Sequence, residues 1–330
     1  MKSREIHLKT RPDGLPKTSD FELVETDVPL PENGQVLVKN LYMSVDPAMR
    51  PPLTNGQTKL NEAMPGGAIG KIVESKNDAF AVGDHVLSRN GFRELYLSDG
   101  SNLERIDLMG EPLTTHLHVL GMTGLTAWGG LLIIGKAKEG ETVFVSAAAG
   151  AVGSTVGQIA KIKGCRVIGS CGSDDKKDIL INELGFDYAF NYKDANIRKE
   201  LQKGAPEGID VYFDNVGGDH LDAALTVMNP RGRIPVCGMI SAYNNRGARS
   251  TGITTLSNII YSQVTLRGFV ATEFLPMKDR FLMEARQWLS QGKLKYRETI
   301  LNGIEKAPEA LIGLFTGLNT GKMLVCISKK

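Results

Sequence analysis

A run of small residues between Val145 and Gly153 is the part of the sequence whose spacing points most directly to chemistry. Gly150 and Gly153 are spaced as G-x-x-G, and Ala148 takes the place of the first glycine in a G-x-G-x-x-G turn. In such a turn the backbone N–H groups approach a pyrophosphate closely, and the anion sits at the N-terminus of the following helix. The segment therefore predicts a dinucleotide-binding turn, provided that a strand precedes it and a helix follows it.

The residues after the second strand indicate which dinucleotide would bind. Proteins that bind NAD usually place an Asp or Glu about 20 residues after the glycine turn, on the ribose hydroxyls. Here Gly169–Ser173 contains no carboxylate, Asp174 and Asp175 suit the start of the next helix, and Lys176 and Lys177 follow. The missing acid and the nearby lysine favour the 2′-phosphate of NADP(H), with two solvated helix lysines as the alternative interpretation.

The charge balance and the low counts of cysteine and histidine argue against nucleic-acid, membrane and metal binding. Lys and Arg number 39 against 37 for Asp and Glu, so a net charge of +2 gives no reason to expect nucleic acid or a membrane surface as the main partner. The chain has only 4 Cys and 5 His, and the cysteines at 165, 171, 237 and 326 form no C-x-x-C pair. We therefore expect no metal site and reduced thiols, which are typical of a cytoplasmic protein.

Two uncharged stretches and the N-terminus bear on membrane targeting. No apolar run follows Met1–Glu5, so we expect no secretory signal. The uncharged residues 119–135 and 142–160 contain several glycines and hydroxyl side chains, and a strand followed by a buried helix explains the second better than a membrane span.

The elements that must position the turn follow from an alternating pattern. From 119 to 290 short apolar strands alternate with helices, which predicts an α/β domain with a doubly wound parallel sheet. The expected strands are 143–146, 165–169, 210–214, 233–237 and 265–270, and the expected helices are 151–163, 175–184 and about 219–228. Residues 1–118 contain short apolar runs separated by Gly, Pro, Asn and Asp, which suits an irregular β-barrel-like domain. Residues 291–330 are too few to fold alone, so we expect them to complete the first domain.

Several segments resemble one family nearly end to end. The cofactor turn Ala147–Ser154 resembles that of the medium-chain dehydrogenase/reductase superfamily, in the prostaglandin reductase branch with leukotriene hydroxydehydrogenases and NADP-dependent alkenal and curcumin reductases. Six further segments agree with that branch: Ser44–Pro47, Gly121–Ala127, Gly172–Asp174, Phe190–Lys193, Phe213–Gly218 and Cys237–Ser241.

The resemblance implies a fold, an assembly and the absence of zinc. It implies a GroES-like irregular β domain (1–118 and 291–330) beside a Rossmann NADP-binding domain (119–290). It also implies a homodimer joined through edge strands near Thr265–Val270. Zinc-dependent relatives need a Cys/His set in the first domain, whereas residues 1–164 contain no cysteine.

The resemblance also assigns cofactor roles by position. It places the pyrophosphate on Gly150–Gly153, the 2′-phosphate on a lysine, the nicotinamide beside a segment after the fifth strand, and the carboxamide against a backbone segment after the sixth. The implied cofactor-binding residues are Gly150, Ala151, Val152, Gly153, Lys176, Tyr192, Asn215, Cys237, Gly238, Ser241, Phe269, Val270, Ala271 and Asn319.

Tyr243 is the implied catalytic residue. By resemblance its phenol hydrogen-bonds the carbonyl of an enone or enal while hydride from NADPH reaches the β-carbon, and the phenol stabilises the enolate. The proton at the α-carbon then comes from Tyr243 or from water. The alternative is a loop tyrosine that only packs on the substrate.

Three other functions remain open on the sequence. A quinone oxidoreductase of the same fold would pass hydride to a quinone, and a non-enzymatic NADPH-binding sensor would bind the cofactor without turnover. A zinc alcohol dehydrogenase is the least supported.

Two departures from the family bear on the substrate. Ala48 stands where relatives often carry an aromatic residue, which enlarges or reshapes the pocket. Arg246 and Arg249 follow Tyr243, where relatives are often Pro-rich, and would suit an acidic substrate or be solvated loop charges.

Overall fold

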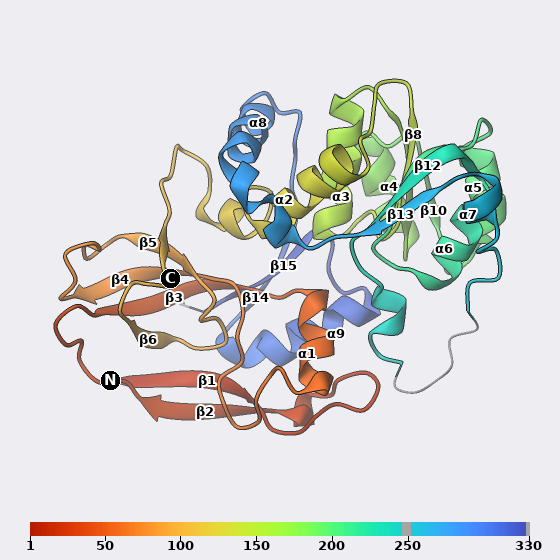
Figure 1. Ribbon diagram of the computed structural model, residues 1–330. Helices are drawn as coiled ribbons and strands as arrows, with labels where there is room; N and C mark the ends of the chain where they lie inside the picture. Colours follow the sequence, from red (N-terminus) through yellow and green to blue (C-terminus); the bar gives the residue numbers. More distant parts are fainter. Residues whose placement is uncertain (246–251, 328–330) are drawn as a thin grey trace. The chain divides into compact units, whose positions relative to one another are not determined.

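The computed structural model describes residues 1–245 and 252–327 as two compact units, Met1–Leu117 with Glu298–Lys330, and His118–Arg297. Residues 291–297, which the sequence pattern placed with the first domain, group with the second unit. Figure 1 gives the element labels used below.

A parallel sheet of six strands forms the centre of the His118–Arg297 unit, in the order β10-β9-β8-β11-β12-β13. The strands are β8 (Thr142–Val145), β9 (Arg166–Cys171), β10 (Tyr188–Asn191), β11 (Ile209–Phe213), β12 (Met228–Val236) and β13 (Thr265–Gly268). The first strand in the chain lies in the middle beside the fourth, so the chain reverses direction across the sheet between β8 and β11. In open α/β sheets this switch point is where ligands bind.

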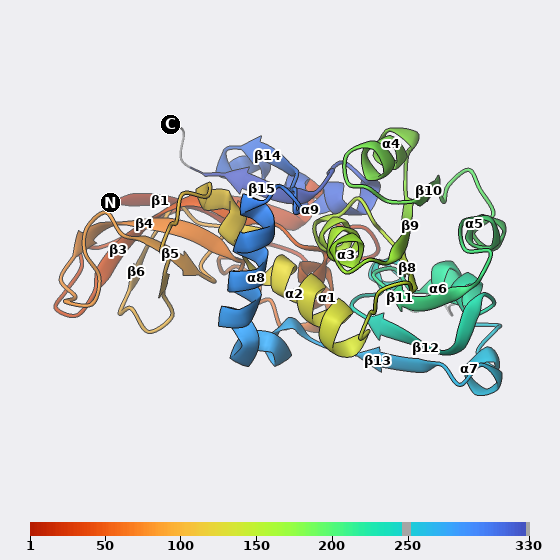
Figure 2. The same ribbon diagram turned by 90° about the horizontal axis from the view of Figure 1, so that it is seen from above.

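Helices cover both faces of this sheet, as Figure 2 shows. The helices are α2 (Met122–Gly129), α3 (Ala151–Ile162), α4 (Asp174–Asn182), α5 (Ile197–Gly204), α6 (Gly218–Ala224), α7 (Asn258–Tyr261) and α8 (Lys278–Ser290). Val143 and Val145 of β8 pack in the core with α2, α3 and α8, while Phe144 between them packs in the core with α5 and α6. Successive strand residues point to opposite faces, so burial of all three requires helices on both sides.

The sequence predicted most of these elements but shifted several boundaries. The strand expected at 233–237 begins already at Met228, and the helix expected to reach residue 228 ends at Ala224. The strand expected through Val270 ends at Gly268, so the carboxamide segment Phe269–Ala271 follows the strand. Strand β10 and helices α2, α5, α7 and α8 were not among the predicted elements.

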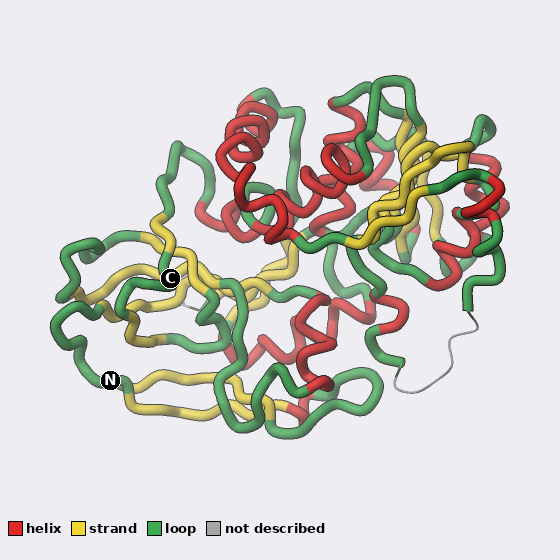
Figure 3. Tube along the Cα trace, in the orientation of Figure 1, coloured by secondary structure: helices red, strands yellow, loops and turns green. Residues whose placement is uncertain are grey.

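The other unit is rich in strands joined by long connections, as Figure 3 shows. Its main sheet has the order β14-β15-β3-β4-β5-β7, with β6 also paired to β3, and β1 and β2 form a separate two-stranded sheet. The strands are β1 (Lys2–Leu8), β2 (Phe21–Asp27), β3 (Val36–Ser44), β4 (Ala68–Ser75), β5 (His85–Ser88), β6 (Leu95–Ser98), β7 (Glu104–Arg105), β14 (Glu298–Asn302) and β15 (Lys322–Cys326), and the helices are α1 (Arg50–Asn55) and α9 (Ala307–Thr316).

The C-terminal segment is built into this unit by pairing and packing. Strand β15 runs antiparallel to β3, with Leu324 opposite Ser44. Ala307 and Leu311 of α9 are buried in one core cluster with Met43 of β3. Burying that apolar surface requires both ends of the chain, so neither segment completes the core alone.

Nothing in the described residues forms a helix long and apolar enough to cross a bilayer. The cytoplasmic location stays a prediction.

Candidate functional site

The small-residue turn after β8 has the shape that the sequence predicted. Ala147 adopts a φ of +49°, and the N–H of Ala148 donates to the Ser170 carbonyl of β9 at 2.8 Å. A Cβ on Gly153 would lie 2.4 Å from the Ala147 carbonyl oxygen, so the first turn of α3 packs against the loop only because residue 153 is glycine.

The N-terminus of α3 is open to an anion. Gly150 occupies the N-cap position, and among the described residues no side chain caps the helix. The N–H groups of Ala151, Val152 and Gly153 lie in the first turn, where an α-helix provides no internal acceptor. Together with the helix dipole, these donors fit the pyrophosphate of a dinucleotide.

Asn215 joins the ends of the two strands that flank the switch point. Its amide Nδ2 donates to the Ser146 carbonyl at 2.7 Å, and its backbone N–H donates to the Ser146 hydroxyl at 3.0 Å. These bonds hold the carboxyl ends of β8 and β11 in one arrangement. A half-buried amide therefore lies beside the small-residue turn that follows β8.

A buried carboxylate, Asp214, ties the same region to β12. One of its carboxylate oxygens accepts from the Tyr212 phenol at 2.6 Å and from the Gly217 N–H at 2.8 Å. Its backbone carbonyl accepts from the N–H groups of Cys237 and Gly238, at 2.8 and 3.1 Å. Burial raises the pKa of Asp214, and burial beside this carboxyl raises the pKa of the Cys237 thiol to about 12.

The segment from Cys237 to Tyr243 folds over the turn that follows β11. The Ser241 hydroxyl donates to the Val216 carbonyl at 2.6 Å, and the Ile240 N–H donates to the Asn215 carbonyl at 3.3 Å. Gly217 in this turn has a φ of +70°, which favours glycine.

The Tyr243 side chain turns back toward the end of β12. Its phenol oxygen accepts from the Met239 N–H at 3.4 Å, and a Cβ on Gly238 would lie 3.1 Å from that oxygen. Burial raises the pKa of Tyr243, so the phenol remains a hydrogen-bond donor at neutral pH.

A second cluster lies at the end of β9, where the 2′-phosphate was expected. Ser173 caps α4 by accepting from the Lys176 N–H. Lys176 is half-buried, and burial lowers its pKa, with the Lys193 charge acting in the same direction. A Cβ on Gly172 would lie 3.5 Å from the Tyr192 phenol oxygen and 3.4 Å from Lys193 Cε.

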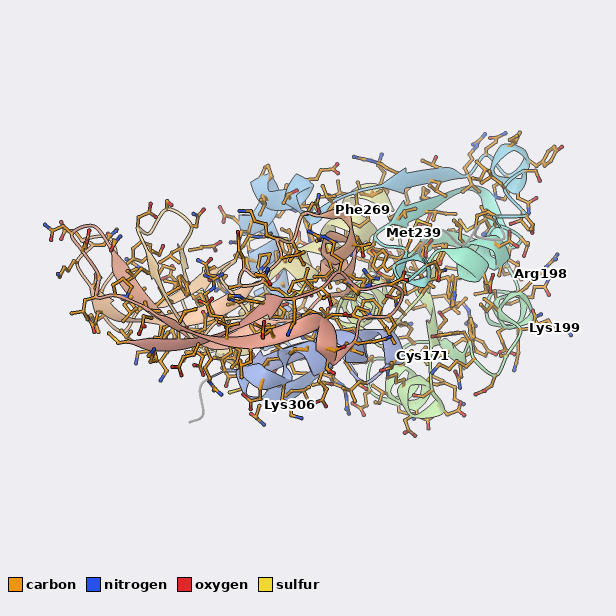
Figure 4. The ribbon with its side chains drawn as sticks, turned by 90° about the horizontal axis from the view of Figure 1, so that it is seen from below. Cys171, Arg198, Lys199, Met239, Phe269 and Lys306 are labelled. Carbon is orange, nitrogen blue, oxygen red and sulfur yellow. The ribbon has the colours of Figure 1, made fainter. Side chains whose placement is uncertain are left out.

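Aromatic packing holds residues Phe269–Ala271, which the family resemblance assigned to the carboxamide. The Phe269 ring meets Phe213 edge to face at a centroid distance of 6.0 Å, and Phe274 lies at 5.5 Å on the other side. The Phe269 side chain therefore packs against the core, whereas the next residue, Val270, is exposed. Figure 4 labels Phe269, Met239 and Cys171 on their separate elements of this unit.

Most residues singled out from the sequence follow the carboxyl ends of the parallel strands. Asn319 is in the other unit, where its amide donates to the Gly321 carbonyl at 2.7 Å. Ala48 is also in that unit, in the short helical turn Pro47–Met49. Arg246 and Arg249 lie outside the described residues.

Sequence reasoning missed four residues of this region. Ser146 and Asp214 organise the switch point, while Lys193 and His220 flank Tyr192. Lys193 could have been noticed because it follows Tyr192 directly. The other three offered no signal, because their role depends on strands and helices that meet only in the folded chain.

The sheet order, the uncapped helix and the small-residue turn define a dinucleotide-binding protein of the Rossmann class. Residues 4–106 match a protein-family model described as the N-terminal domain of oxidoreductase, and residues 151–285 match one described as zinc-binding dehydrogenase. Within the described residues no three His, Cys, Asp or Glu side chains are grouped to hold a metal ion.

Comparison with known proteins places the chain within this class. It is 42% identical over 322 residues to prostaglandin reductase 1 of Oryctolagus cuniculus, covering 96% of this chain and 90% of the relative. It is 38% identical over 337 residues to the NADPH-dependent curcumin reductase of Escherichia coli, covering 99% of this chain and 97% of the relative. The crystal structure of CurA in complex with NADPH from Vibrio vulnificus superposes with a TM-score of 0.93 at 39% identity, covering 99% of this chain and 100% of that one. The chain belongs to the medium-chain dehydrogenase/reductase superfamily, in the branch of the prostaglandin, curcumin and 2-alkenal reductases.

Proposed function

We propose that the protein, an NADP-dependent oxidoreductase, reduces the carbon–carbon double bond of α,β-unsaturated aldehydes and ketones without zinc. The observation that carries this proposal is the position of the Tyr243 phenol beside Gly238, in the same unit as the N-terminus of α3. Relatives named as NADPH-dependent curcumin reductase and NADP-dependent 2-alkenal reductase support it.

The coenzyme would be held by groups from several strand ends. The first-turn N–H groups of α3 would bind the pyrophosphate, and Lys176 and Tyr192 would bind the adenosine end with its 2′-phosphate. On the nicotinamide side lie Asn215, the segment Cys237–Ser241 and the backbone of Phe269–Ala271. We also assign Asn319 to the coenzyme.

The chemistry divides between coenzyme and protein. NADPH, when bound, supplies the hydride that reaches the β-carbon of the substrate. Negative charge then develops on the carbonyl oxygen, and the Tyr243 phenol donates a hydrogen bond to it. Tyr243 or water delivers the proton to the α-carbon.

Polarisation by hydrogen bonding makes a Lewis acid unnecessary in this scheme. Residues 1–164 contain no cysteine, so this part of the chain offers no thiolate ligand for a catalytic zinc, and Cys326 of β15 is the single cysteine of that unit. Turnover that survives prolonged chelation and dialysis supports this proposal. One zinc per chain, with activity lost on its removal, would favour a zinc alcohol dehydrogenase.

We further propose a homodimer in which β13 of each protomer pairs with its counterpart. Strand β13 is at the edge of the parallel sheet, and its four residues Thr265–Gly268 are exposed. Nearby, Ile260 and Tyr261 of α7 are 75% and 83% exposed. An exposed edge strand flanked by large apolar side chains readily pairs with another chain.

One assay separates the candidate functions. The pure protein is given NADPH or NADH with an alkenal, an aromatic enone or a quinone. NADPH-dependent loss of the enone double bond supports the proposal. Turnover of the quinone alone would favour a quinone oxidoreductase, and NADPH binding without any turnover would favour a sensor.

A further inference from the structure

Beyond Lys176 and Tyr192, two residues belong to the adenosine end of the proposed coenzyme site. We propose that Lys193 is a second cation for the 2′-phosphate, and that His220 is a positioning residue that holds the Tyr192 ring in place. This inference rests on the proposed use of NADPH and concerns how the chain distinguishes NADPH from NADH.

The geometry places Lys193 and Tyr192 on one side of the bend that leads into α4. A Cβ on Gly172 would lie 3.4 Å from Lys193 Cε and 3.5 Å from the Tyr192 phenol oxygen, so both side chains lie over this bend. Lys176, one turn into α4, is close enough to Lys193 for that charge to lower its pKa. The end of the Lys193 side chain and the Tyr192 phenol therefore lie together over residue 172, and Lys176 is close enough to feel the Lys193 charge.

Charge pairing distinguishes Lys193 from its neighbour Lys177. Lys177 makes an ion pair with Asp174 at 2.8 Å, so its charge is already compensated on the surface. Among residues 1–245 and 252–327, no carboxylate lies within ion-pair distance of Lys193. A phosphomonoester beside Lys193 would supply a counterion for that lysine, and it would accept hydrogen bonds from Lys193 and Lys176 together.

His220 fixes the Tyr192 ring from beneath. The two rings meet edge to face at a centroid distance of 5.1 Å and an angle of 73°, and His220 is 3% exposed. Its backbone N–H donates to the Gly217 carbonyl at 3.2 Å, which anchors the imidazole to the turn that begins with Asn215. Burial lowers the pKa of His220 to about 4, so the ring is neutral at physiological pH and acts by packing, not by charge.

The first test compares Lys193→Ala with Lys199→Ala. Figure 4 shows Arg198 and Lys199 on the outer side of α5, so the control removes the same charge from the same unit at an exposed position. Dissociation constants for NADPH, NADH and 2′,5′-ADP are measured by calorimetry without substrate, at low and high salt. In Lys193→Ala we expect the dissociation constants for NADPH and 2′,5′-ADP to rise about tenfold, and that for NADH to change less than about twofold.

The outcomes separate this inference from the proposed function. Suppose that the unsubstituted protein binds NADPH. If Lys193→Ala then has the same dissociation constants as Lys199→Ala, or binds NADPH and NADH more weakly by the same factor, the role of Lys193 is wrong and the proposed function stands. If the unsubstituted protein binds neither NADPH nor 2′,5′-ADP, the proposed function itself fails.

The second test concerns His220 and uses a rescue. His220→Ala removes the ring that packs against Tyr192. The affinity for NADPH should fall roughly fivefold relative to the affinity for NADH, because Tyr192 is no longer held in place. His220→Phe keeps an edge-to-face partner of similar size and should restore the NADPH preference. Thermal melting of each variant shows whether it folds. Equal losses for both coenzymes in His220→Ala, or no recovery in a folded His220→Phe protein, would overturn the positioning role.

Discussion

The amide of Asn215 donates to the carbonyl of Ser146 at 2.7 Å, and this bond joins the residue after β11 to the residue after β8. The two strands are adjacent in the sheet although 63 residues separate Val145 from Ile209 in the chain. The bond places a polar side chain at the switch point of the parallel sheet.

Replacing Asn215 with Asp should weaken the coenzyme site. A carboxylate cannot donate to the Ser146 carbonyl and repels it, and it also brings negative charge toward the pyrophosphate. We expect the dissociation constant for NADPH to rise at least about tenfold. Asn182→Asp, on the exposed end of α4, makes the same chemical change away from the turn. Equal NADPH affinity in the two variants would contradict the role of Asn215.

Replacing Tyr243 with Phe should lower turnover and leave coenzyme binding intact. Loss of one donor to a developing oxyanion costs roughly 100-fold or more in kcat. Tyr261→Phe removes a phenol that is 83% exposed and serves as the control. Single-turnover rates with an alkenal, together with NADPH titrations, measure both quantities. Unchanged turnover in Tyr243→Phe would leave Tyr243 as a packing residue only.

The pH dependence of Tyr243 has a definite sign. Burial raises the pKa of its phenol above the ordinary value of 10, and the protonated form is the donor. Its contribution to kcat should therefore be constant from pH 6 to about 9 and be lost only as the pH rises through the raised pKa. The ratio of kcat for the wild-type protein to kcat for Tyr243→Phe, measured as a function of pH, isolates the contribution of this phenol. A ratio that falls between pH 6 and 8 would count against this assignment.

Replacing Lys322 with Met should destabilise the unit that contains it. The Lys322 side chain is 1% exposed and donates to Asp46 at 2.8 Å and to the Val45 carbonyl at 2.9 Å. Removing it leaves a carboxylate and a buried carbonyl without that donor. We expect a loss of about 2–3 kcal/mol in the free energy of unfolding, below the full cost for a buried pair because Asp46 is partly solvated.

Urea denaturation measures this loss against a surface control. Lys59→Met breaks an exposed pair with Glu62, in which the side chains are 72% and 59% exposed. The loss in the free energy of unfolding for Lys59→Met should stay below about 1 kcal/mol. A difference of less than about 0.5 kcal/mol between the two variants would mean that burial does not strengthen the Lys322 pair.

Replacing Leu266 with Lys should dissociate the proposed homodimer. Leu266 is the second residue of the exposed edge strand β13, and a charged side chain there opposes pairing with a second copy. Light scattering after gel filtration should give the molar mass of one chain for Leu266→Lys and of two chains for the unsubstituted protein. Met283→Lys on α8, 66% exposed, should remain a dimer.

The sequence was sufficient for the turn after β8 and for the alternating strands and helices. Small residues from Ala147 to Gly153 and the period of the apolar residues are local features, and a local pattern can be recognised without the rest of the chain. Boundaries were less certain where propensity and context conflict. The strand was expected at residues 233–237, yet β12 begins at Met228, because Met228 as well as Arg233 pairs with the neighbouring strand β11.

What the sequence determined by itself was the class of the protein and the strand–turn–helix around Ala147–Gly153, because short segments with recognisable side-chain sizes and spacings recur along the chain. Only the tertiary structure decided that Ser146 meets Asn215, that Asp214 holds the end of β12, and that His220 packs under Tyr192. Such contacts join residues from different strands and helices. Their formation depends on strand order and on burial from two faces, and neither can be read from one segment alone.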